Sequence, residues 1–189
     1  MESIGGQLQD CPWLTGFPLW TGKGRIELMM LKGPVEWALH CCAILSGLQQ
    51  GRYLATKDLA EFHGIPKEYL SKALQNLSKA SILETSLGPR GGYRLAKLPD
   101  KITFLDIVEA VEGRHSTFVC TEIRKNNPCR ATNIPDSGPC AVARVMWEAD
   151  EAWRAHLKSV LLSDLLEAVK NEVSEELLLK SRAWISERT

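Results

Sequence analysis

Residues 56–96 constrain the fold most, because two short helical patterns are followed there by two strand-like runs. A helix is expected from Thr56, which we interpret as its N-cap, and a second helix over 67–80. The apolar stripe predicted for the second helix consists of Tyr69, Leu70, Ala73, Leu74 and Leu77. The Gly-Ile-Pro sequence at 64–66 supplies a tight turn between the two helices. Two short helices joined by such a turn predict a helix-turn-helix.

The two strand-like runs, 82–85 and 93–95, flank the sequence Gly-Pro-Arg-Gly-Gly at 88–92. Since Gly and Pro favour turns, this stretch predicts a β-hairpin with the glycines at its tip. A hairpin that directly follows a helix-turn-helix is the wing of a winged-helix domain. The alternative is an ordinary hairpin on an unrelated domain.

A further short helix is expected over 103–112, starting at a Thr cap, and a long one after Pro139. The apolar residues of the long helix are spaced by three or four: Val142, Met146, Ala149, Trp153, Leu157 and Val160. This near-heptad stripe is typical of a helix that packs against a partner, although an intramolecular core helix is an alternative. The predicted fold is therefore mainly α, a winged helix-turn-helix with a small β-hairpin wing and a long C-terminal dimerisation helix.

The sequence divides into four expected regions. They are a disordered N-terminal extension (1–28), a winged helix-turn-helix DNA-binding domain (29–98), a short helix with a cysteine-bearing loop (99–138), and a dimerisation helix with further C-terminal helices (139–189).

Charge is distributed unevenly, although Lys and Arg together number 23 and Asp and Glu together number 23. Residues 52–94 contain seven basic and four acidic residues, whereas residues 145–189 contain six basic and nine acidic ones. The first of these regions is therefore suited to face the phosphates of double-stranded DNA. The candidate DNA contacts are Lys67, Tyr69, Ser71, Lys72 and Gln75 on the outer side of the second helix, and Arg90 at the wing tip. Gln75 suits adenine, Lys72 suits guanine or phosphate, and Arg90 suits a minor groove.

Hydropathy and the cysteine count indicate the compartment. No apolar run approaches the ~20 residues that span a bilayer, and the first residues lack the pattern of a secretory signal. We expect a cytoplasmic protein without a membrane partner. In that compartment the six cysteines are expected to be thiols, metal ligands or redox groups rather than a disulfide framework.

Three cysteines fall in or beside an irregular segment that runs from Gly113 to Pro139. Eight residues separate Cys120 from Cys129, and ten separate Cys129 from Cys140, so this is not the paired CxxC pattern of structural zinc. A long irregular loop inside a compact domain needs a stabilising cause. A bound metal or cluster would provide one, because ligand binding orders the loop.

The sequence VEWALHCC at 35–42 places an acidic and an imidazole side chain on one face of an otherwise apolar helix. Glu36 and His40 are separated by four residues and project together. They could complete a cluster or metal site with two loop cysteines, or they could be an ordinary surface pair. Cys41 and Cys42 point elsewhere on the helical wheel and are expected to be core residues.

From Met30 to about Asp164, these elements resemble the Rrf2 (BadM-type) family of winged-helix transcription regulators, many of which hold an iron–sulfur cluster through loop cysteines. The matching stretches are YLSKALQNLSKASIL, GPRGGYRLAK, FLDIVEAVEG and the three-cysteine loop. VEWALHCC and FVCTEIR are most similar to a redox-sensing member with a 2Fe–2S cluster. The resemblance implies a homodimer whose cluster is bound by Glu36 and His40 of one chain and by two loop cysteines of the other. Carried over, these cysteines are Cys129 and Cys140, while Cys120 is a ligand in a 4Fe–4S form, a spare thiol, or neither.

The predicted function is therefore that of a DNA-binding regulator, a repressor rather than an enzyme, whose iron–sulfur cluster senses redox state and controls operator binding. A cluster with only two thiolates and an imidazole has a raised reduction potential, as in Rieske centres. Two alternatives remain: a cluster-free, thiol-based regulator of the same fold, and a zinc enzyme that uses Glu36, His40 and cysteines.

Overall fold

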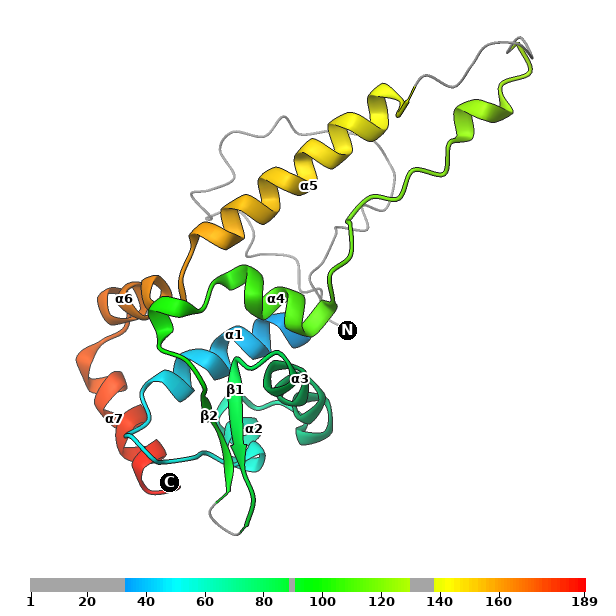
Figure 1. Cartoon of the computed structure of the whole chain (residues 1–189). Coiled ribbons are helices and arrows are strands. Elements are labelled where there is room, and N and C mark those ends of the chain that lie inside the picture. The colour runs from blue at the N-terminus through cyan, green and yellow to red at the C-terminus, as the bar shows by residue number, and fades with distance from the viewer. Residues whose placement is uncertain (1–32, 89–90, 130–137) are drawn as a thin grey trace, which may run out of the picture. The chain divides into compact units, whose positions relative to one another are not determined.

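The computed structural model describes residues 33–88, 91–129 and 138–189 (Figure 1). The elements are α1 (Gly33–Ser46), α2 (Thr56–His63), α3 (Lys67–Lys79), β1 (Leu83–Ser86), β2 (Gly92–Leu95), η2 (Pro99–Lys101), α4 (Phe104–Glu112), η3 (Ile123–Asn126), α5 (Ala141–Ser159), α6 (Leu162–Glu172) and α7 (Glu175–Ser186). The mainly α class with one small antiparallel sheet is thus confirmed for the described residues. The extension predicted at 1–28 and the candidate Arg90 lie outside them.

The predicted helix-turn-helix is formed by α2 and α3. Gly64 ends α2 in the left-handed conformation, at φ 64° and ψ 32°, which glycine adopts without strain. The buried face of α3 consists of Leu70, Ala73, Leu74 and Leu77. The three leucines pack in the core with residues of α1 and α4.

Two details of this motif differ from the sequence prediction. Ala55, not Thr56, is the N-cap of α2, since its extended backbone accepts the Asp58 N–H at 3.0 Å and no side chain caps the helix. Tyr69 was predicted in the inner stripe of α3, but its side chain is 66% exposed. It lies in the first turn, about 100° from Leu70 on the helical wheel, and this rotation takes it off the core face.

The hairpin predicted as a wing is formed by β1 and β2. The strands pair antiparallel, with Glu84 opposite Arg94 and Leu83 opposite Leu95. The chain before α2 also joins this hairpin, because Leu54 and Tyr93 exchange backbone hydrogen bonds of 3.0 and 2.9 Å. Gly92 is required at this contact, since a Cβ there would lie 2.2 Å from the Leu54 carbonyl oxygen.

Helix α1 crosses the centre of the core and contacts α3 and α4. Its buried residues are Val35, Ala38, Cys41, Cys42 and Leu45. The prediction that Cys41 and Cys42 are core residues is confirmed, since both are 0% exposed. Burial raises the pKa of Cys41 to about 12 and also raises that of Cys42, so both remain neutral thiols.

The predicted Thr cap of the short helix is confirmed at the start of α4. The Thr103 side chain accepts the Asp106 N–H at 3.0 Å, and the Asp106 carboxylate accepts the Thr103 N–H at 2.9 Å. This is a reciprocal capping box. The capping box therefore fixes where α4 begins after the wing.

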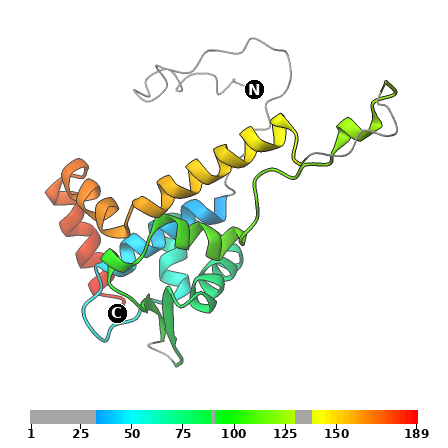
Figure 2. The same ribbon diagram turned by 45° about the horizontal axis from the view of Figure 1, so that its top comes forward.

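Helix α5 packs chiefly on α4, which itself packs on α1 and α3 (Figure 2). The buried side chain of α5 is that of Ala143, whereas Val142 is 64% and Met146 37% exposed. The first half of the predicted apolar stripe is therefore uncovered within a single chain, whereas Trp153 and Leu157 are half-buried. This favours a helix that packs against a partner over the core-helix alternative.

The chain returns to the core after α5. Backbone hydrogen bonds join Phe104 to Val160 at 2.9 Å and Leu162 to Ile102 at 2.8 Å, and Leu162 is fully buried. Helix α7 then packs against α2, where the Trp184 and Phe62 ring centroids are 5.2 Å apart. None of the described helices is both long enough and apolar enough to span a membrane.

Candidate nucleic-acid interface and cysteine segment

The outer face of α3 presents most of the predicted DNA contacts. Lys67, Tyr69, Lys72 and Gln75 are exposed, whereas Ser71 is half-buried. The Ser71 hydroxyl donates to the Lys67 carbonyl oxygen at 2.8 Å, so its proton is used within the helix and its oxygen remains an acceptor. This face can therefore offer amine, phenol and amide groups to base edges and phosphates.

The base of the wing is held by Tyr53, Glu84 and Arg94. The Tyr53 hydroxyl donates to the Glu84 carboxylate at 2.8 Å, and the Arg94 guanidinium donates to the same oxygen. These two hydrogen bonds, from Arg94 first and Tyr53 second, lower the pKa of Glu84. The guanidinium carbon of Arg94 also lies 5.0 Å from the centroid of the Tyr53 ring. Arg94 therefore contacts Glu84 and Tyr53 and orients the hairpin.

Glu36 and His40, two of the predicted ligands, are both exposed on α1. The His40 ring centroid lies 5.9 Å from that of His63, the last residue of α2. His63 carries a buried Nε2 atom without a hydrogen-bond partner, and burial together with His40 lowers its pKa. His63 is not among the residues that the sequence predicts for a site, because no local pattern relates it to a residue on a different helix.

Two of the three candidate cysteines are brought together. Cys140 is the N-cap of α5, where its sulfur accepts the Ala143 N–H at 3.4 Å, and the Cys120 side chain lies beside it. The Ala143 N–H, Cys120 and the nearby Arg124 charge lower the pKa of the Cys140 thiol. Cys129 is exposed, and its N–H donates to the Asn127 side chain at 2.9 Å.

The predicted ligands do not form a complete site within one chain. Among the residues that the structure describes, no three side chains of His, Cys, Asp or Glu come together to hold a metal ion. Glu36 and His40 on α1 are one incomplete set of donors, and the Cys120–Cys140 pair at the start of α5 is another.

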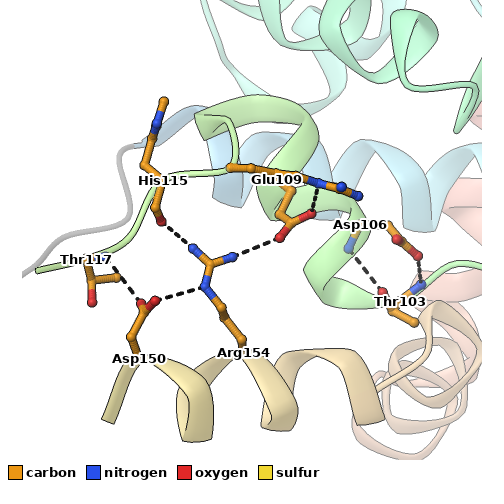
Figure 3. Close-up of polar contacts among 8 residues, drawn as sticks. Thr103, Asp106, Glu109, His115, Thr117, Asp150 and Arg154 are labelled. Carbon is orange, nitrogen blue, oxygen red and sulfur yellow. Dashed lines mark hydrogen bonds and ion pairs between the residues drawn. The ribbon is translucent and has the colours of Figure 1, made fainter. Parts of the chain in front are cut away.

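A charged network centred on Arg154 joins α5 to α4 and to residues 115–117, near the start of the cysteine segment, residues 113–140 (Figure 3). Arg154 donates to Asp150 on its own helix at 3.0 Å, to Glu109 of α4 at 2.8 Å, and to the His115 carbonyl oxygen. Asp150 also accepts the Thr117 N–H at 3.3 Å. The i, i+4 spacing of Asp150 and Arg154 was readable as a helix-surface pair, but nothing in the sequence indicated the contacts with Glu109 and His115.

Comparison with known proteins assigns the family. The Rrf2 family, described as "Iron-dependent Transcriptional regulator", matches residues 31–168. A putative HTH-type transcriptional regulator of Aquifex aeolicus is 31% identical over 138 residues, which cover 73% of this chain and 92% of that protein. The HTH-type transcriptional regulator NsrR of Geobacillus kaustophilus is 32% identical over 154 residues, which cover 82% of this chain and 99% of that protein.

The fold is shared with solved structures of regulators. CymR of B. subtilis, whose structure is titled as that of the global cysteine regulator, has a TM-score of 0.58 and 20% sequence identity. The alignment covers 75% of this chain and 98% of that one. The match to the family extends from α1 into α6 and includes the helix-turn-helix, the wing and the cysteine segment. The chain therefore belongs to the Rrf2 family and is a winged-helix, DNA-binding transcriptional regulator rather than an enzyme.

Proposed function

We propose that this regulator is a homodimeric repressor whose 2Fe–2S cluster senses redox state and controls its affinity for an operator. Glu36 and His40 of one subunit and two loop cysteines of the other hold the cluster. Cys140 is one of these cysteines, and Cys129 or Cys120 is the second. When bound, the cluster supplies a one-electron redox centre.

The observation that supports the proposal is the placement of the predicted ligands in each chain. Glu36 and His40 are both exposed on α1, and the Cys120 side chain lies beside that of Cys140 at the start of α5. Carboxylate, imidazole and thiolate fit an iron–sulfur cluster chemically, and a lowered Cys140 pKa favours the thiolate that binds metal. Since no three such groups meet within the described part of one chain, a second chain is the natural source of the missing donors.

The uncovered apolar side chains near the cysteines support the dimer. Val142 and Val145 of α5 are 64% and 62% exposed, and Trp147 is 40% exposed. Val119 and Ile123 of the cysteine segment are 77% and 76% exposed. Exposed apolar side chains in this number are costly in water and are suited to contact with a second copy of the chain.

In this arrangement α3 enters the major groove of the operator. Lys67 and Lys72 contact phosphate or guanine, Gln75 contacts adenine, and Tyr69 and Ser71 supply further polar contacts. Arg90 at the wing tip contacts the adjacent minor groove. A change of cluster charge acts on α1 through His40, and α1 contacts α3 directly. The regions proposed at 29–98, 99–138 and 139–189 accordingly bind DNA, hold the cluster and form the dimer.

Analysis of anaerobically purified protein tests the cofactor. We expect iron and acid-labile sulfide in equal amounts and visible charge-transfer bands, which the His40→Ala and Cys140→Ser variants should lose. Titration of one operator fragment with oxidised and with reduced protein tests the switch. Colourless, iron-free protein would refute the proposed cluster. Equal operator affinities of the oxidised and reduced protein would refute the proposed redox control.

A mixed dimer tests whether the ligands come from two chains. One subunit carries His40→Ala and the other carries Cys140→Ser, with different affinity tags to isolate the heterodimer. If each site spans both chains, the two substitutions fall in the same site and the heterodimer keeps half of the wild-type iron. If each site lies within one chain, both sites are damaged and the heterodimer contains no iron.

The contact between the Cys120 and Cys140 side chains also favours a second candidate, a cluster-free regulator that senses oxidants through these thiols. Mild oxidation would then join the two cysteines in a disulfide, with the electrons passing to a peroxide or similar oxidant. Mass spectrometry of iron-free protein before and after oxidation would detect this bond. Its formation together with changed operator affinity would favour the second candidate over the cluster.

A further inference from the structure

We propose that Arg154 is a positioning residue that fixes the start of the cysteine segment to α4 and α5, and thereby couples the state of this segment to α3, the recognition helix of the helix-turn-helix. The coupling rests on the proposed function, because it needs two states of the cysteine segment. The attachment itself does not depend on the cluster.

The Arg154 side chain joins three separate parts of the chain (Figure 3). Its Nε donates to Asp150 at 3.0 Å, its Nη1 donates to Glu109 of α4 at 2.8 Å, and its Nη2 donates to the His115 carbonyl oxygen. The Asp150 carboxylate extends the attachment, because its other oxygen accepts the Thr117 N–H at 3.3 Å. Residues 115–117 are thus held by α5 on one side and through Arg154 to α4 on the other.

Burial makes these contacts stronger than surface ion pairs. The exposed fractions of the Arg154, Glu109 and Asp150 side chains are 23%, 17% and 10%. Hydrogen bonds from Thr117 and from Arg154 lower the pKa of Asp150, which keeps its carboxylate charged. By contrast, the Arg114 side chain, which also pairs with Glu109, is 86% exposed, so solvent screens its charge.

The chemistry of the site requires arginine. A guanidinium is planar and directs its N–H groups along fixed, divergent axes, so one side chain can serve two carboxylates and a carbonyl oxygen at once. A lysine ammonium is a single point charge and cannot reach all three acceptors from one position. The arrangement therefore depends on geometry as well as on charge.

The same contacts lie between the cysteines and the DNA-binding surface. Thr117 is three residues before Cys120, whose side chain contacts Cys140 at the start of α5. The cysteine segment is consequently attached to α5 at two points, Cys120 at Cys140 and residues 115–117 at Asp150 and Arg154. Glu109 connects the Arg154 contact to α4. Since α4 packs directly on α3, a displacement of residues 115–117 is passed to the recognition helix through Arg154 and Glu109.

The variant Arg154→Gln tests the proposal, with Arg114→Gln as the matched control for loss of one positive charge beside Glu109. Hydrogen–deuterium exchange of the cluster-free protein should show faster exchange in residues 114–118 of Arg154→Gln, on the order of 10-fold. The control should keep wild-type exchange. Arg154→Lys should behave like Arg154→Gln, and Asp150→Asn, a milder change, should loosen the Thr117 amide alone.

The second measurement is the ratio of operator affinities of oxidised and reduced protein. In Arg154→Gln the ratio should approach one while the protein still binds the operator, and in Arg114→Gln it should equal that of the wild type. Wild-type exchange in Arg154→Gln would overturn the attachment, and faster exchange with an unchanged ratio would overturn the coupling. Equal affinities in the wild type itself would refute the proposed function, and exchange alone would then decide whether Arg154 holds the segment.

Discussion

Replacement of Cys42 by serine should destabilise the protein without affecting binding of the proposed cluster. The Cys42 side chain is 0% exposed and packs in the core with Cys41 and Leu45, so the new hydroxyl is buried among apolar groups. Burial of a hydroxyl with an imperfect partner costs about 1–3 kcal/mol in proteins. Serine in a helix can donate to the carbonyl four residues earlier, here that of Ala38, which places the expected cost in the lower half of this range.

Urea unfolding of the cluster-free protein under reducing conditions measures this cost. For a chain of this size the loss corresponds to a decrease in Tm of about 2–4 °C per kcal/mol. Cys129→Ser is the matched control, because Cys129 is exposed and its replacement should change the free energy of unfolding by less than about 0.5 kcal/mol. Equal unfolding midpoints for Cys42→Ser and the wild type would refute the assignment of Cys42 to the core. Loss of iron from Cys42→Ser that still folds would refute its exclusion from the ligands.

Three further substitutions test the helix cap, the DNA contacts and the charged network. Thr103→Ala removes the capping box with Asp106 and should lower the free energy of unfolding, measured by urea titration, by about 1 kcal/mol. Thr103→Ser keeps a capping hydroxyl and should lower the same free energy by less. Lys72→Ala should weaken binding to all DNA sequences alike and reduce the slope of log K against log salt by about 0.9, and an unchanged slope would exclude a phosphate contact. Asp150 has a pKa lowered from its usual 3.8, so the stability it contributes is present above that value and is lost as the pH falls through the lower pKa of the folded state. The difference in unfolding free energy between wild type and Asp150→Asn should therefore be constant above about pH 5 and shrink below it, and a difference independent of pH would contradict this assignment.

Local patterns in the sequence predicted the elements that depend on near neighbours. The helix-turn-helix, the wing, the Thr103 cap and the burial of Cys41 and Cys42 follow from helical and strand periodicity, which relates residues only a few positions apart. The errors occurred at helix starts, where such patterns are least informative. The ring of Tyr69 suggested a place in the buried stripe, yet Tyr69 points about 100° away from the neighbouring Leu70 and is exposed.

The sequence alone determined the class of the protein, because the order of short helices, hairpin and long helix leaves few ways to bury the apolar faces. Only the tertiary structure decided which polar side chains meet. The contact of Cys120 with Cys140 depends on where the segment between them returns to α5, and the approach of His63 to His40 depends on how α2 packs beside α1. Arg154 likewise meets Glu109 from 45 residues away and His115 from 39. Such contacts are set by the docking of whole helices, and no spacing within one helix encodes them.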